Sequence, residues 1–171
     1  QAGAIREARE RFERLTETGR ANAQIWLLLA TACRADGDVA GEEAAIDQVL
    51  AIEPGAVRAH IMKADCRLKA GDEPGALRFY RSGLLRAERQ RLPEDLLAEV
   101  RRAEQAVADI RARMEMKTEA LLSQFGLPLE KRSPRFQQAL DISAGRKQVF
   151  MQEPTAFYYP ELPQAQYYDL D

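Results

Sequence analysis

The chain has 171 residues, of which 46% are hydrophobic and 30% charged, a balance typical of a folded globular protein rather than a disordered one. Its formal net charge of -2 argues against a nucleic-acid-binding protein, because no basic excess is present to displace the counterions of phosphates. The apolar run at residues 25–30 is far shorter than the about 20 residues that cross a bilayer, so we expect no membrane span.

The two cysteines, Cys33 and Cys66, are too few for a disulfide framework, and each lies in a helical apolar pattern. We expect both to be buried free thiols, which fits a reducing compartment and therefore a cytoplasmic protein. The sequence starts at Gln1, already within a helical pattern, so we expect it to be part of a longer protein.

A period of 34 residues runs through the first half of the chain, where the Gly-Asp pair at residues 37–38 recurs at 71–72. The same register aligns Trp26 with His60, Ala30 with Ala64, Ile46 with Tyr80 and Leu50 with Leu84. This pattern resembles the tetratricopeptide repeat over residues 4–89, with 4–17 as the second helix of an incomplete first repeat. The resemblance implies a right-handed stack of helix pairs, each covering the apolar face of its neighbour.

Single residues in the repeats predict where the helices end. Gly37 and Gly71 are expected to end the first helix of each pair in a left-handed conformation. Pro54 is expected to stop a second helix. Glu42 occupies a position that the tetratricopeptide family usually gives to Ala, and we expect this carboxylate on a solvated face. His60 is expected to pack between helices rather than to bind a metal.

After residue 89 the period is lost, and a long helix is predicted from about residue 92 to the stop at Gly126. Its apolar residues recur in steps of three and four and form one narrow stripe: Leu96, Val100, Ala103, Val107, Ile110, Met114, Thr118, Leu121 and Phe125. Two interpretations stay open, a helix that caps the repeat stack and a coiled coil that pairs two copies into a homodimer.

A shorter helix is predicted over residues 134–144, with Ser133 as its cap and Gly145 as its stop. Its expected buried side consists of Phe136, Ala139, Leu140 and Ile142.

Prolines at positions 154, 160 and 163 exclude a helix in the last part of the chain, which is therefore predicted to be extended. We thus divide the chain into repeats at 1–90, two helices at 91–146 and an extended aromatic tail at 147–171. We expect the tail to contact a following domain through Phe157, Tyr158, Tyr159, Tyr167 and Tyr168. The alternatives are packing on the two preceding helices and a structureless tail.

Three short segments carry a second resemblance: RFQQALDI at 135–142, QEPT at 152–155 and YPELPQ at 159–164. Together they resemble the region just before the catalytic domain of bacterial aspartyl/asparaginyl β-hydroxylase-like proteins that carry tetratricopeptide repeats. The resemblance covers residues 134–171. It implies that the parent protein is an Fe(II)- and 2-oxoglutarate-dependent oxygenase and that the tail is a linker into its catalytic domain.

Such an oxygenase site needs two histidines and an arginine for 2-oxoglutarate, whereas His60 is the only histidine of this chain. We therefore assign no catalytic, cofactor-binding or metal-binding residue here, and expect the chain itself not to be an enzyme. The sequence also lacks a Gly-rich phosphate loop after a predicted strand and a clustered zinc motif.

Binding is the remaining function, because the first helices of stacked pairs line a concave surface. The outward positions of these helices predict a peptide-binding groove made of Gln24, Leu27, Thr31, Arg34, Arg58, Ile61, Asp65 and Lys69. Leu27 and Ile61 either form apolar contacts in this groove or pack against a neighbouring helix. The sequence thus favours an all-α protein-interaction module at the front of an oxygenase, and the alternative is a free-standing adaptor.

Overall fold

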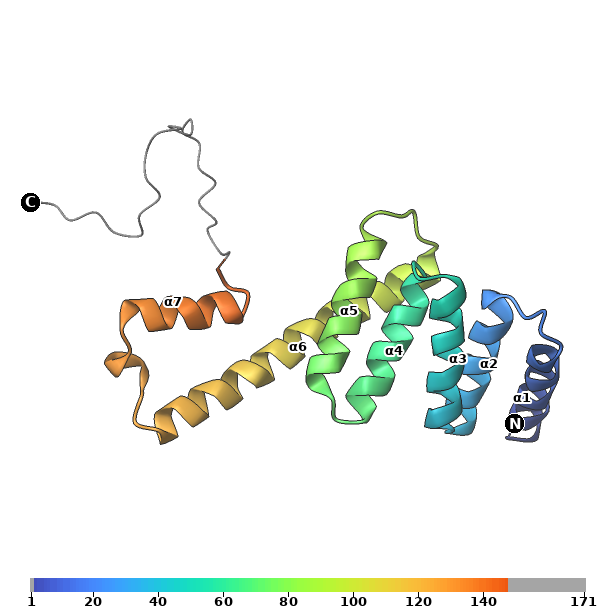
Figure 1. Cartoon of the computed structure of the whole chain (residues 1–171), viewed down its shortest axis with the longest axis horizontal. Coiled ribbons are helices and arrows are strands. Elements are labelled where there is room, and N and C mark those ends of the chain that lie inside the picture. The colour runs from blue at the N-terminus through green and yellow to red at the C-terminus, as the bar shows by residue number, and fades with distance from the viewer. Residues whose placement is uncertain (1, 148–171) are drawn as a thin grey trace, which may run out of the picture.

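The computed structural model describes residues 2–147, and the regular secondary structure of this part of the chain is all helical, without a strand. Five helices stand side by side in a row (Figure 1): α1 (Ala2–Glu17), α2 (Ala23–Asp36), α3 (Val39–Ile52), α4 (Val57–Lys69) and α5 (Glu73–Ala87). The long helix α6 (Glu94–Gln124) runs across the end of this row and projects beyond it. A short 3-10 turn, η1 (Leu129–Lys131), then leads into α7 (Pro134–Ser143). The predicted all-α helical-repeat fold is confirmed.

Glycine and proline end the repeat helices where the sequence predicted. Gly37 follows α2 with φ of 80° and donates its N–H to the Arg34 carbonyl, and Gly71 has φ of 79° after α4. These left-handed conformations carry little cost for a residue without a Cβ. Helix α3 ends at Ile52, two residues before Pro54.

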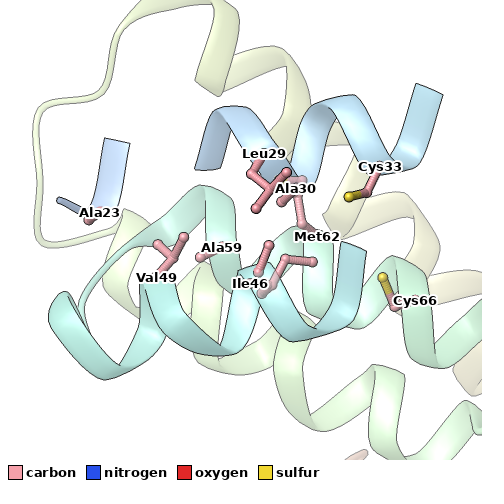
Figure 2. Close-up of a cluster of buried hydrophobic side chains, with 10 residues drawn as sticks. Ala23, Leu29, Ala30, Cys33, Ile46, Val49, Ala59, Met62 and Cys66 are labelled. Atoms are coloured by element: carbon pink, nitrogen blue, oxygen red, sulfur yellow. The ribbon is translucent and has the colours of Figure 1, made fainter. Parts of the chain in front are cut away.

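A first core cluster lies between α2, α3 and α4 (Figure 2) and contains both cysteines as buried free thiols, as predicted. Ala30 and Ala59 are fully buried there, and their small side chains let the helices approach closely. The buried residues of the first core cluster are Ala23, Leu29, Ala30, Cys33, Ala45, Ile46, Val49, Ala59, Met62 and Cys66.

A second core cluster joins α4 and α5 to the first half of α6, which supplies Val100, Ala103, Val107 and Ile110. The other buried members are Val57, Ile61, Ala64, Ala76 and Tyr80. These contacts show that the first half of α6 caps the repeat stack. The 3.6-residue period of the apolar stripe is what lets one face of α6 follow the stack.

The second half of α6 leaves the stack, so the rest of the stripe is solvent-exposed. Leu121 is 54% exposed and Phe125 is 76% exposed. Helix α7 lies at this projecting end (Figure 1), where Arg132 binds Glu119 at 2.7 Å and Arg146 pairs with Glu115.

The start of α7 was predicted correctly, because the Ser133 side chain accepts a hydrogen bond from the backbone of Phe136. Its predicted buried side was wrong. No residue of α7 is buried: Phe136 and Ala139 are exposed, and Leu140 and Ile142 are only half-buried. The reason is position, since the segment around α7 is anchored by ion pairs to the second half of α6 and no residue of α7 belongs to either core cluster.

The predicted aromatic contacts at Phe157, Tyr158, Tyr159, Tyr167 and Tyr168 lie outside the described residues. Among the helices of residues 2–147, none combines the length and the apolar character that crossing a membrane requires.

Candidate peptide-binding cleft

An open cleft of about 840 Å³, here called the central cleft, lies where α2, α4 and α6 meet. Its lining residues are Thr31, Arg34, Arg58, Met62, Asp65, Leu68, Lys69, Tyr80, Glu99, Arg102 and Ala106. Apolar side chains and charged side chains thus share one cavity.

The repeat explains why α2 and α4 form two neighbouring walls of the central cleft. They are the first helices of successive pairs, so residues 34 positions apart take equivalent places. Thr31 corresponds to Asp65 and Arg34 to Leu68, and all four residues line the cleft. The capping helix α6 supplies the third wall through Glu99, Arg102 and Ala106.

Asp65 is buried at the floor of the central cleft and binds side chains from three helices. Its Oδ1 accepts a hydrogen bond from the Tyr80 hydroxyl at 2.5 Å. Both oxygens accept from Arg102, at 2.9 Å each, and Arg34 Nη2 lies 3.4 Å from Oδ2. This paired geometry fixes the planes of both groups.

The Asp65 cluster perturbs the groups around it. Burial, and then the hydrogen bond to Asp65, raises the pKa of Tyr80 to about 12. The hydrogen bond to Asp65 also raises the pKa of Arg102. At neutral pH the Tyr80 hydroxyl and the Arg102 guanidinium therefore both carry their protons and donate hydrogen bonds to Asp65.

Glu42 is only 1% exposed, so the prediction of a solvated carboxylate was wrong. Its Oε1 accepts from Arg34 Nε at 2.6 Å, and its Oε2 lies 3.5 Å from Lys69 Nζ. Two cations from successive repeats compensate the buried negative charge of Glu42. The sequence of one repeat does not show that the second cation is close by. Glu42 thereby links α2, α3 and α4 directly behind the central cleft.

Arg58 occupies the other end of the central cleft, near the start of α4. Its Nε donates to Glu99 Oε1 at 2.9 Å, and its Nη2 pairs with Asp95. Two carboxylates of α6 therefore balance this one guanidinium.

Five of the eight residues predicted for the groove line the central cleft: Thr31, Arg34, Arg58, Asp65 and Lys69. Three do not. Gln24 is exposed outside the lining, and Leu27 is half-buried against the first core cluster. Ile61 is fully buried in the second core cluster, because α6 and α5 cover that face of α4. For Leu27 and Ile61 the alternative of helix packing is the correct one.

Six lining residues were missed at the sequence level: Met62, Leu68, Tyr80, Glu99, Arg102 and Ala106. Leu68 had a usable signal, since it stands 34 residues after Arg34. The lining residues of α6 had no such sequence signal. That helix lies outside the repeat, and the place where it crosses the repeat stack depends on tertiary packing.

His60 packs between helices, as predicted. It is buried, its Nε2 donates to the Pro54 carbonyl at 2.9 Å, and burial lowers its pKa. Across residues 2–147, no three His, Cys, Asp or Glu side chains converge in a way that would hold a metal ion. The described residues therefore do not fit the Fe(II) site of the oxygenase family, which needs two histidines.

No protein-family model and no curated protein matches the chain. Among solved structures, it is similar to PcrH in the crystal structure of PcrH in complex with the chaperone binding region of PopD. The TM-score is 0.59 at 23% sequence identity, and the match covers 67% of this chain and 84% of the PcrH chain. The chain therefore shares its all-α helical-repeat fold with PcrH.

Proposed function

We propose that this chain is a protein-interaction module that binds a peptide segment of a partner protein in the central cleft. The observation that carries the proposal is the cleft itself, an open cavity of about 840 Å³ where apolar and charged side chains from four helices meet. Clefts of this composition suit extended or helical segments. The fold's likeness to PcrH supports the proposal, since that protein was solved with the binding region of another protein.

The test is a selection of phage-displayed random peptides of about twelve residues, long enough to occupy such a groove. Peptides recovered on the wild-type chain are then measured against Ala106→Trp, which fills the central cleft from α6. The matched control is Ala108→Trp, two residues along the same helix, exposed and outside the lining. Circular dichroism checks that each variant is folded.

The proposal expects binding that survives in Ala108→Trp and is lost in Ala106→Trp. Because Ala106 also packs against the second core cluster, Thr31→Trp provides an independent block from an exposed position on α2. Peptides that bind all three variants equally would place recognition elsewhere and contradict the proposal. So would a selection that yields no peptide dependent on the cleft.

We also propose that this module is the front part of a bacterial aspartyl/asparaginyl β-hydroxylase-like oxygenase, where it recruits a protein substrate or mediates self-association. The support is the sequence resemblance of residues 134–171. Fe(II) and 2-oxoglutarate would then belong to the catalytic domain of the parent protein, not to this chain. The two buried free thiols favour the cytoplasm as its location.

The gene sequence after Asp171 tests this assignment. The oxygenase proposal expects a coding segment with two spaced histidines and a downstream arginine. A coding sequence that ends near Asp171 would contradict it and leave the free-standing adaptor, with the same cleft and the same mode of binding.

Self-association through α6 is the third element of the proposal. It rests on the apolar side chains that the second half of α6 exposes, among them Leu121 and Phe125. Sedimentation equilibrium is expected to show a dimer that Leu121→Glu dissociates, whereas Ala112→Glu, at an exposed position outside the apolar stripe, leaves it intact. A monomeric wild-type chain at high micromolar concentration would contradict the pairing.

A further inference from the structure

The charged side chains of the central cleft are unevenly distributed between its two ends. Four cations line it, Arg34, Arg58, Lys69 and Arg102, together with the carboxylates of Asp65 and Glu99, and Glu42 and Asp95 pair with these cations from outside the lining. Cations and carboxylates balance over the whole cleft, so an anionic group is attracted only where the cations locally outnumber the carboxylates.

The cations differ in how far they are already neutralised. Arg58 forms ion pairs with Glu99 and Asp95, so its charge is already neutralised within the structure. Lys69 makes a single long ion pair, 3.5 Å to Glu42, and its side chain is 50% exposed. An ammonium group has three N–H donors, so Lys69 has donors to offer a ligand.

Three cations and two carboxylates gather at the Lys69 end of the cleft. Arg34 lies between Glu42 and Asp65, and Arg102 binds Asp65 while remaining 50% exposed. Both carboxylates are buried and bonded to these cations, so the group leaves one positive charge that faces the open side. Apolar side chains of Met62, Leu68 and Ala106 line the same cavity.

We infer that the central cleft selects partner segments in which a carboxylate stands beside an apolar side chain. The carboxylate meets Lys69 and Arg102, and the apolar side chain packs on Met62, Leu68 and Ala106. The inference rests on the proposed function and names the chemistry of its ligand. A basic segment is disfavoured, because the carboxylates of the lining are already bound by arginines.

The peptides recovered from the phage-display selection supply the first test. Among those that need an open cleft, Asp and Glu should be enriched over the unselected library and Lys and Arg depleted. The second test is the affinity of one such acidic peptide, by fluorescence anisotropy, for Lys69→Gln and for the control Lys131→Gln. Lys131 is exposed on η1 and lies outside the cleft.

Lys69→Gln removes one exposed ion pair with the peptide carboxylate and is expected to weaken binding about two- to fivefold. Lys131→Gln removes no such pair and should bind the peptide as the wild-type chain does. Added salt should weaken wild-type binding and reduce the difference between the two variants. Cleft-dependent peptides without acidic enrichment, or equal affinities of both variants, would overturn the inference and leave the proposed function intact. A selection without cleft-dependent peptides would overturn the proposed function, and this inference with it.

Discussion

At the scale of single residues, Asp65 connects the repeat stack to the capping helix. A buried carboxylate destabilises a protein unless its oxygens are bonded, and here Tyr80, Arg102 and Arg34 surround it. Asp65 comes from α4, Tyr80 from α5 and Arg102 from α6. This one side chain therefore positions two walls of the central cleft as well as stabilising the fold.

Replacing Asp65 with Asn is expected to lower the free energy of unfolding by about 2 kcal/mol, because the amide leaves hydrogen bonds to Arg102 incomplete and removes the charge. The cost is less than for a fully buried pair since Arg102 remains half exposed. Urea denaturation followed by circular dichroism measures it. The control Asp109→Asn, which removes an exposed charge bonded only to Gln105, should change stability by less than about 0.5 kcal/mol. Equal losses in both variants would show that Asp65 has no special role.

The two thiols provide a second prediction at this scale. Burial, followed by the nearby Glu42 carboxylate, raises the pKa of Cys66 to about 12 from its ordinary value of 9.0, and burial raises that of Cys33. At pH 9 an ordinary thiol is half ionised, while Cys66 in the folded protein stays protonated. We expect its reaction with an aromatic disulfide reagent to be more than about a hundredfold slower than after unfolding in guanidinium.

The same shift has a consequence for stability. A thiol whose pKa is raised in the folded state contributes stability that is fully present below pH 9 and is lost as the pH rises towards about 12. In the labelling experiment at pH 9, both thiols should react rapidly after unfolding in guanidinium, whereas neither should react rapidly in the folded chain. Rapid labelling of the folded chain would contradict the burial of both cysteines.

At the scale of elements, α6 has two halves with different environments. Val100, Ala103, Val107 and Ile110 are buried against the stack, whereas Met116 and Leu121 are exposed in the projecting half. Isolated helical segments of this length are marginal in water, and burial of apolar side chains stabilises only the first half. The second half is held to α5 by exposed ion pairs of Arg113 and Lys117 with Glu73.

Hydrogen exchange measured by mass spectrometry should distinguish these halves. At low micromolar concentration, we expect amides of residues 112–124 to exchange at least about tenfold faster than those of residues 100–110. Protection of the second half should then rise with protein concentration if α6 pairs two copies. Equal protection of both halves in the dilute chain would contradict a capping role limited to the first half.

The turns before α3 and α5 contain a repeated helix cap that the sequence predictions did not include. Asp38 caps α3 by accepting from the Gly41 N–H at 2.9 Å, and Asp72 caps α5 by accepting from Gly75 N–H at 2.9 Å. Both pairs recur at the 34-residue period, so a search for repeated Asp-x-x-Gly motifs would have located both helix starts.

At the scale of the whole molecule, the repeat stack was predictable because its signals are local. Gly37, Gly71 and Pro54 end helices through backbone geometry alone, and the 34-residue period orders the pairs. The burial of Glu42 was not predictable, since it depends on Lys69 arriving from the next repeat.

The central cleft was predictable only in part for a similar reason. Its two repeat walls follow the period, which is why Thr31 and Asp65 were placed in the groove. Its third wall depends on where α6 crosses the stack, and that crossing also buries Ile61. A sequence period describes neighbours within the repeat, not a helix that packs across it.

The most direct test of the central claim is an NMR titration of the ¹⁵N-labelled chain with a selected peptide. Binding in the central cleft predicts amide shift changes that concentrate at Thr31, Asp65, Lys69 and Ala106, from three different helices. Shift changes confined to α1 or α7, with these four amides unmoved at saturation, would contradict the assignment of the central cleft as the binding site.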